Sequence, residues 1–129
     1  MQNTLGGEAL SSPEATGFIP VNLPTEKFLT EFLARKARAD TLVIDPPRDG
    51  MHPSALPSIM AFGAHEIIYV SCNPSTLVRD LGPLLGARSY DAPPETPTPL
   101  PLYRLTDIIP VDMFPHTHHI ETVVRLERI

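Results

Sequence analysis

Short apolar runs alternate with amphipathic stretches along the middle of the chain. Two of these runs, TLVI at 41–44 and EIIYVS at 66–71, end at polar turns that contain proline. Such runs are typical of strands buried on both faces of a parallel sheet. Three further stretches have strand-like patterns, at 18–24, 103–114 and 119–128. The last two are joined by a short connection, which predicts a hairpin and an antiparallel edge.

Three stretches between these runs predict helices, and they lie at 25–39, 54–63 and 73–86. Gly63 suits the end of the second helix. Asn73 suits the N-cap of the third helix, and Pro74 its first position. Because strands alternate with helices, we expect an α/β fold built from parallel βαβ units.

The helix expected at 25–39 ends in a basic segment. Thr25 is its expected N-cap. Arg35, Lys36 and Arg38 fall in its last turns, where cations interact favourably with the helix dipole.

Composition narrows the class of protein. The chain has 129 residues and 42% hydrophobic residues, enough for one modest core. The single cysteine cannot form an internal disulfide, so a reducing compartment, the cytoplasm, is expected. No apolar run reaches the roughly 18 residues of a membrane span. The net charge of −5 argues against binding of nucleic acid through overall charge.

Two segments fall outside the expected core. Residues 1–17 lack periodicity and are rich in small polar residues, so we expect a disordered or tag-like leader. Residues 91–101 (DAPPETPTPLP) contain too many prolines for a helix or a central strand, and an exposed loop is expected there rather than a Pro-rich recognition motif. The remaining domain then spans residues 18–129.

Cys72 lies between a buried strand and the start of a helix. The positive end of the helix dipole stabilises a thiolate there and favours a reactive nucleophile. The alternative is a small buried core thiol.

The DPPR turn at 45–48 follows the first strand. Its two prolines stiffen the loop, so that Asp45 and Arg48 are held in fixed directions. Asp45 can accept hydrogen bonds from a ligand, and Arg48 can pair with a carboxylate or phosphate. A solvated turn is the alternative. In an open α/β sheet, ligands bind beyond the carboxyl ends of the strands, so DPPR and SCNP (71–74) are expected to line one cleft.

The last connection and strand are dense in polar groups. Glu121 lies in an otherwise apolar strand and could act as a general base, or could simply occupy the polar side of an edge strand. His116, His118 and His119 resemble metal ligands in type, but no second Cys or His pair stands at zinc-site spacing. We therefore predict no metal site.

Three segments together resemble the C-terminal half of the RNA uracil-5-methyltransferases, which methylate uridine in ribosomal and transfer RNA. They are DPPRDG (45–50), YVSCNPSTLVRDL (69–81) and PVDMFPHTHHIETVVRL (110–126). The resemblance implies a Rossmann-like methyltransferase sheet that uses S-adenosyl-L-methionine and acts on 23S ribosomal RNA or transfer RNA.

The resemblance also implies roles for six residues. Cys72 would be the nucleophile that adds to C6 of uracil, and Glu121 the base that removes the C5 proton. Asp45 would contact the cofactor. Substrate contacts would fall to the remaining three, Arg48, Asn73 and His116.

The chain departs from the family pattern in its first part. It lacks the strand and Gly-rich loop that begin the methyltransferase fold and cradle the cofactor. With one cysteine it cannot hold the iron–sulfur cluster of many relatives, which would have to lie in an absent N-terminal part. We therefore expect a partial catalytic domain with little activity alone.

The alternative reading is a truncated assembly or RNA-docking module without catalysis. Its exposed sheet edge would favour a homodimer. An amino-methyltransferase with an Asp-Pro-Pro-aromatic motif fits less well, because Arg48 replaces the aromatic residue.

Overall fold

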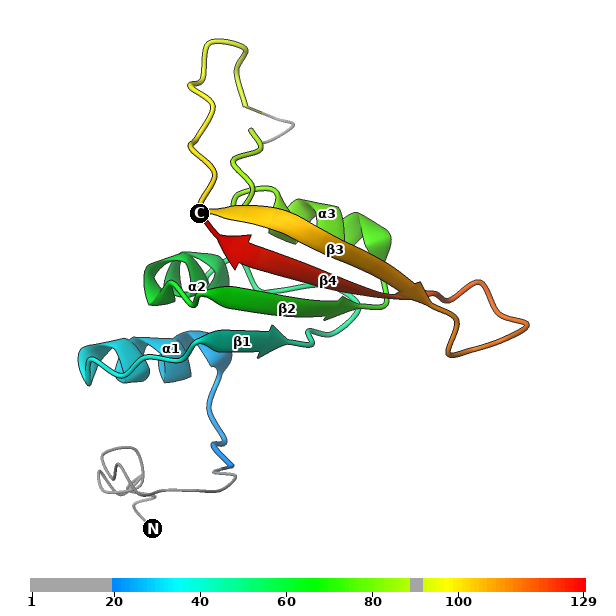
Figure 1. The fold of residues 1–129 in the computed structure, drawn as a ribbon, viewed down its shortest axis with the longest axis horizontal. Helices are drawn as coiled ribbons and strands as arrows, with labels where there is room; N and C mark the ends of the chain where they lie inside the picture. The colour runs from blue at the N-terminus through cyan, green and yellow to red at the C-terminus, as the bar shows by residue number, and fades with distance from the viewer. Residues whose placement is uncertain (1–19, 89–91) are drawn as a thin grey trace.

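Four strands form one sheet in the computed structural model, which describes residues 20–88 and 92–129 (Figure 1). The strands are β1 (Thr41–Ile44), β2 (Glu66–Ser71), β3 (Tyr103–Val111) and β4 (Glu121–Arg128). The helices are α1 (Thr25–Ala34), α2 (Ala55–Phe62) and α3 (Pro74–Leu81). Their order across the sheet is β1-β2-β4-β3, with β1 parallel to β2 and β4 antiparallel to both of its neighbours. The predicted α/β fold with an antiparallel hairpin is confirmed.

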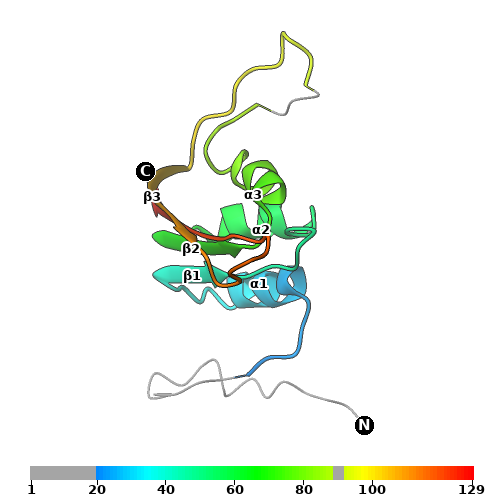
Figure 2. The same cartoon turned by 90° about the vertical axis from the view of Figure 1, so that its right-hand side faces the viewer.

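All three helices cover the same face of the sheet (Figure 2). Alternate residues of β2 and β4 point into that layer, and Ile67, Tyr69, Val124 and Leu126 are almost fully buried there. Ile59 of α2 packs against the same cluster. Each such side chain contributes about 1.5–3 kcal/mol when it is fully buried, so this single layer is the core of the described chain.

β1 is not buried on both faces, which corrects the prediction from its apolar sequence. Val43 is 65% exposed, because β1 is an edge strand and its side chain points to the face that the helices do not cover. An apolar run alone does not show whether both faces of its strand are covered.

Helix α1 is shorter than its sequence pattern predicts. Thr25 does not cap it; Pro24 occupies the N-cap position without a side-chain hydrogen bond. The helix stops at Ala34, because the chain turns at Lys36, whose φ of 55° is left-handed. Backbone N–H groups of Lys36 and Ala37 then close the last turn. The cations expected in the helix therefore lie in its connection to β1.

The sequence signals for the end of α2 and the N-cap of α3 are confirmed. Gly63, with a φ of 62°, ends α2, and the side chain of Asn73 caps α3 by accepting from the Ser75 N–H at 3.1 Å. α3 nevertheless ends at Leu81, and residues 82–86 form turns.

Neither the described part of the N-terminal segment nor that of the proline-rich loop forms a helix or strand. The part of the predicted 18–24 strand that the structure describes, residues 20–24, is irregular, and 18–19 lie outside the described residues, as does the 1–17 leader. Residues 92–101 of the proline-rich loop contain no helix or strand. Within the described ranges, no helix has the length and apolar character that a membrane span requires.

Candidate active site

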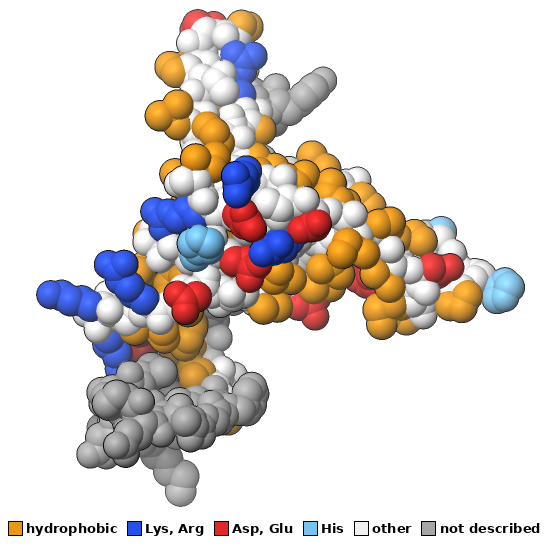
Figure 3. Space-filling model, in the orientation of Figure 1, with side chains coloured by type: hydrophobic (Ala, Val, Ile, Leu, Met, Phe, Trp, Pro, Cys, Tyr) orange, Lys and Arg blue, Asp and Glu red, His pale blue; other side chains and the backbone are white. Residues whose placement is uncertain are grey.

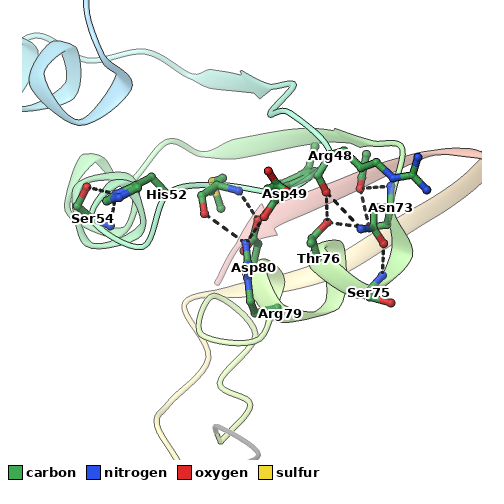
Figure 4. A network of polar contacts seen from close by, with 12 residues as sticks. Arg48, Asp49, His52, Ser54, Asn73, Ser75, Thr76, Arg79 and Asp80 are labelled. Carbon is green, nitrogen blue, oxygen red and sulfur yellow. Dashed lines mark hydrogen bonds and ion pairs between the residues drawn. The ribbon is translucent and has the colours of Figure 1, made fainter.

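The DPPR loop and the SCNP turn meet at the carboxyl edge of the sheet (Figure 4). Asn73 of the SCNP turn and Thr76 of α3 bond the same atom of the loop, the carbonyl oxygen of Arg48. Asn73 donates to it from Nδ2 at 3.2 Å, and Thr76 donates from Oγ1 at 3.3 Å. The two motifs are thus in contact, but the cleft beside them is lined by Asp45, Pro46 and Pro47 of DPPR and by no residue of SCNP.

Ser71 fixes the turn that carries Cys72. Its side chain is buried, and its hydroxyl accepts from the Asn73 N–H at 3.1 Å and donates to the Asn73 carbonyl at 3.0 Å. Cys72 itself is half-buried, one residue beyond β2 and two before α3 begins. The thiol thus lies on a backbone held from both sides, at the N-terminal end of a helix.

The strand register brings Cys72 beside Glu121. β2 and β4 pair antiparallel, with Ser71 opposite Thr122 as their last partners. Cys72 directly follows Ser71, and Glu121 directly precedes Thr122, so both residues adjoin this last pair. Glu121 is half-buried at the start of β4, and its neighbour Thr122 points into the helix layer. The carboxylate therefore faces the uncovered side of the sheet.

Asp80 is the functional candidate that sequence reasoning missed. This carboxylate of α3 is 5% exposed and accepts three hydrogen bonds. The Met51 N–H and the Tyr69 hydroxyl donate to Oδ2, both at 2.7 Å, and Arg79 donates from Nε to Oδ1 at 2.8 Å. Burial and the bond to Asp80 raise the pKa of Tyr69. A signal was present, since Asp80 falls between Leu77 and Leu81 on the apolar stripe of its helix.

Asp80 and Arg79 fasten the end of the DPPRDG loop to α3. Arg79 also donates from Nη2 to the Asp49 carbonyl at 2.9 Å. The loop passes so close that a Cβ on Gly50 would lie 2.5 Å from Arg79 Nη2 and 2.6 Å from Asp80 Oδ2. Gly50 has a φ of 79°, so glycine is required here for both space and conformation.

Asp45 is exposed directly after β1 and lines a cleft of about 580 Å³. The wall of this cleft is largely apolar, and Glu26 and Asp49 are two further carboxylates on it, beside the Arg79 guanidinium. Asp45 and Glu26 could therefore accept from a cationic ligand. The lining of this cleft comes from α1, β1, the loop after β1, α2 and α3.

The three residues expected to contact substrate differ in how free they are. The Arg48 guanidinium is exposed and pairs with no carboxylate among the described residues. Both polar ends of the Asn73 side chain are already bonded, to Arg48 and Ser75. His116 is exposed in the β3–β4 connection with a φ of 69°. This connection extends beyond the end of β2, on the side of Cys72 (Figure 1).

The histidines of that connection do not form a metal centre in the described part of the chain. The rings of His118 and His119 lie 4.1 Å apart. Across residues 20–88 and 92–129, no group of three or more His, Cys, Asp or Glu side chains could hold a metal ion.

Comparisons with known proteins agree on the type of protein. The family model for tRNA (uracil-5-)-methyltransferases matches residues 27–129. An uncharacterized RNA methyltransferase of Clostridium acetobutylicum is 45% identical over 102 residues, which cover 79% of this chain and 19% of that protein. One from Chlorobaculum tepidum is 42% identical over 113 residues, covering 88% of this chain and 20% of that protein.

A solved structure is also similar. It is the Pyrococcus abyssi tRNA (uracil-54, C5)-methyltransferase in complex with S-adenosyl-L-homocysteine, with a TM-score of 0.51 and 37% identity. The match covers 67% of this chain and 18% of that one. The chain spans about a fifth of the length of the curated relatives it matches. Since the family model matches most of its residues, the chain belongs to the tRNA (uracil-5-)-methyltransferase family.

Proposed function

We propose that this chain supplies the nucleophile and the general base of an RNA uridine C5 methyltransferase. The supporting observation is the register of β2 and β4, whose last pair, Ser71 and Thr122, adjoins Cys72 on one strand and Glu121 on the other. A thiol and a carboxylate at these positions can act on the two adjacent ring atoms, C6 and C5, of one uracil. The target uridine leaves its stack to reach them.

The two side chains act in sequence. The Cys72 thiolate forms a bond to C6, and the electron pair of the C5–C6 double bond moves into an enolate that is nucleophilic at C5. S-adenosylmethionine, when bound, supplies the methyl group that C5 accepts. Glu121 then takes the C5 proton, the double bond re-forms, and the sulfur–C6 bond breaks to release the thiolate.

Asp45 and the cleft beside it form the part of the cofactor site that this chain contains. The carboxylate suits the cationic amino group of S-adenosylmethionine, and the apolar wall suits its uncharged parts. Because the sequence has no strand followed by a Gly-rich loop that could cradle the cofactor, we infer that the site is incomplete. Turnover by this chain alone is expected to fall far below the roughly 1 per second of ordinary enzymes.

The RNA target is a ribosomal or transfer RNA, and Arg48 is the residue best suited to hold it. Its exposed guanidinium extends from a loop that Asn73 and Thr76 hold in place, and guanidinium groups pair well with phosphate. We infer that His116, in the β3–β4 connection, contacts the same RNA. Asn73 acts on substrate through the loop it orients.

A test that needs no cofactor follows from the chemistry. In RNA labelled with tritium at C5 of uridine, addition of Cys72 to C6 lets C5 accept a proton from water. Glu121 then removes the tritium from C5, Cys72 leaves C6, and the tritium is released into water. We expect the chain to release tritium without S-adenosylmethionine. Cys72→Ala should abolish release, and Glu121→Gln should slow it by about 100-fold or more.

Glu95→Gln is the matched control, since Glu95 is an exposed carboxylate in the proline-rich loop. It should release tritium at the original rate. Release that persists in Cys72→Ala, or no release from RNA that the chain binds, contradicts the proposal. Calorimetry with S-adenosylmethionine tests the incomplete site separately, because micromolar binding, about −8 kcal/mol, would show that the cofactor site is present.

A second candidate function, self-association without catalysis, is favoured by one observation. β1 has an unpaired edge in the described sheet, and Val43 is 65% exposed on it. Such an edge can pair with a second strand. Light scattering checks this directly, since a dimer that Val43→Lys converts to a monomer supports edge pairing and a monomeric original chain excludes it.

A further inference from the structure

A second hollow lies at the edge of the sheet opposite to Cys72. Its volume is about 670 Å³, and it opens where β1 and β2 begin and β4 ends. Its charged or titratable lining consists of Lys36, Arg38, Asp40, His65 and Arg128. Figure 3 shows Lys and Arg side chains gathered at this end of the molecule. Three permanent cations thus face one carboxylate.

These cations do not complete the end of α1. The carbonyl groups there accept from backbone donors, with the Lys36 N–H to Leu33 at 2.9 Å and the Ala37 N–H to Phe32 at 3.2 Å. Within the described residues, the side chains of Lys36 and Arg38 make no hydrogen bond or ion pair. Both are exposed in a short connection, where they are free to meet a ligand.

Arg128 contributes differently, because it is held in place. Its Nη1 donates to the Gly63 carbonyl at 2.5 Å, at the C-terminal end of α2. This bond offsets the partial negative charge of that helix end. Because this bond holds the guanidinium beside the hollow, its remaining N–H donors stay available to a ligand.

Asp40 is the carboxylate of the hollow, and the acidic residues next to His65 and Arg128 in the sequence are paired elsewhere. Glu66 pairs with Arg125, and Glu127 pairs with Arg104 at 2.7 Å and with Arg125 at 3.2 Å. Glu66, Arg125 and Glu127 occupy positions of β2 and β4 that alternate with the buried ones, and Figure 3 shows acidic and basic side chains side by side in the middle of the view. The chain is therefore polarised, and its net charge of −5 hides a local excess of positive charge.

We propose that this hollow binds a backbone phosphate of the RNA strand whose uridine is presented to Cys72. The inference rests on the proposed function and deepens it by adding a second contact. β2 has six residues, so the amino and carboxyl ends of this strand lie about 20 Å apart. A strand of several nucleotides spans that distance and is held at both ends.

Salt-dependent binding tests the proposal. Affinity for a short uridine-containing single-stranded RNA is measured by fluorescence anisotropy over a range of salt concentrations. Each phosphate contact contributes about 0.7 to the slope of log affinity against log salt. Because the hollow holds one phosphate, Lys36→Gln/Arg38→Gln should lower the slope by about 0.7, and Lys36→Gln by a smaller amount. Lys27→Gln, an exposed lysine of α1 outside the hollow, should leave it unchanged.

Three results would overturn the inference. They are an unchanged slope in the double variant, an equal change in Lys27→Gln, and the absence of RNA binding by the original chain. Binding of inorganic phosphate that the double variant loses, with an unchanged RNA slope, would assign the hollow to a free anion and also overturn it. Circular dichroism confirms that each variant is folded.

Tritium release separates this inference from the proposed function. At saturating RNA the double variant should release tritium from C5 at the original rate, because Cys72 and Glu121 are intact. No release by the original chain, together with a reduced slope in the double variant, would contradict the chemistry and leave the phosphate contact standing.

Discussion

Replacement of Asp80 by asparagine tests whether this buried carboxylate holds the DPPRDG loop on α3. All three of its partners are donors: the Met51 N–H, the Tyr69 hydroxyl and Arg79 Nε. An asparagine side chain presents one accepting oxygen and one NH₂ group. At least one donor is therefore left facing another donor in a site where the original side chain is only 5% exposed.

The expected loss of stability follows from these contacts. A hydrogen bond to a charged group contributes about 1.5–3 kcal/mol, and a buried unsatisfied donor costs about 1–3 kcal/mol. The ion pair between Asp80 and Arg79 adds little, because Arg79 is 54% exposed. We expect Asp80→Asn to lower the free energy of unfolding by about 3 kcal/mol, a large share of the total of about 5–15 kcal/mol.

Urea unfolding measures this loss. With a slope of about 2 kcal/mol per molar urea, the midpoint should fall by about 1.5 M. Asp49→Asn is the matched control: its exposed side chain has no hydrogen-bond partner among the described residues, so its effect should stay within about 0.5 kcal/mol. Equal midpoints for the two variants would refute the structural role of Asp80.

A double-mutant cycle makes the same test specific to one bond. Tyr69→Phe removes the hydroxyl that donates to Asp80 at 2.7 Å. If the two groups act as a pair, the combined variant should lose less stability than the sum of the single variants, with a coupling of about 0.5–3 kcal/mol. Full additivity would mean that the bond does not contribute.

Two further predictions concern the same loop and core. Gly50→Ala should lower the free energy of unfolding by about 2 kcal/mol or more, because Gly50 has a left-handed φ and the new Cβ would contact Arg79 and Asp80 too closely. Gly82→Ala should have no such effect, because its new Cβ would lie at ordinary contact distances. Thermal melts of the two variants measure the difference. Because burial raises the pKa of Tyr69, its contribution is complete below about pH 10 and is lost as pH rises toward the folded value. Stability measured through that range should fall less steeply in Tyr69→Phe, and an unchanged profile would contradict the burial argument.

Much of the local structure could be predicted from sequence, because the signals act over a few residues. The cap at Asn73, the end of α2 at Gly63 and both parallel strands were predicted where the structure has them. Each depends on the backbone geometry or hydrogen bonding of one side chain near its own position in the chain. The end of α1 was predicted too late, since helical periodicity does not detect a left-handed turn at Lys36.

The chemical groups of this protein, and the elements that hold them, could be predicted from the residues alone. The thiol of Cys72, the DPPR loop and the capped helix follow from residue types and their immediate neighbours. The three-dimensional fold was needed to show that Glu121 and Cys72 adjoin the last pair of β2 and β4, that Asp80 bonds the loop, and that the cations after α1 share a hollow with Arg128. Those pairings join residues about 30 to 90 positions apart, and they depend on strand order and register, which no short window of sequence contains.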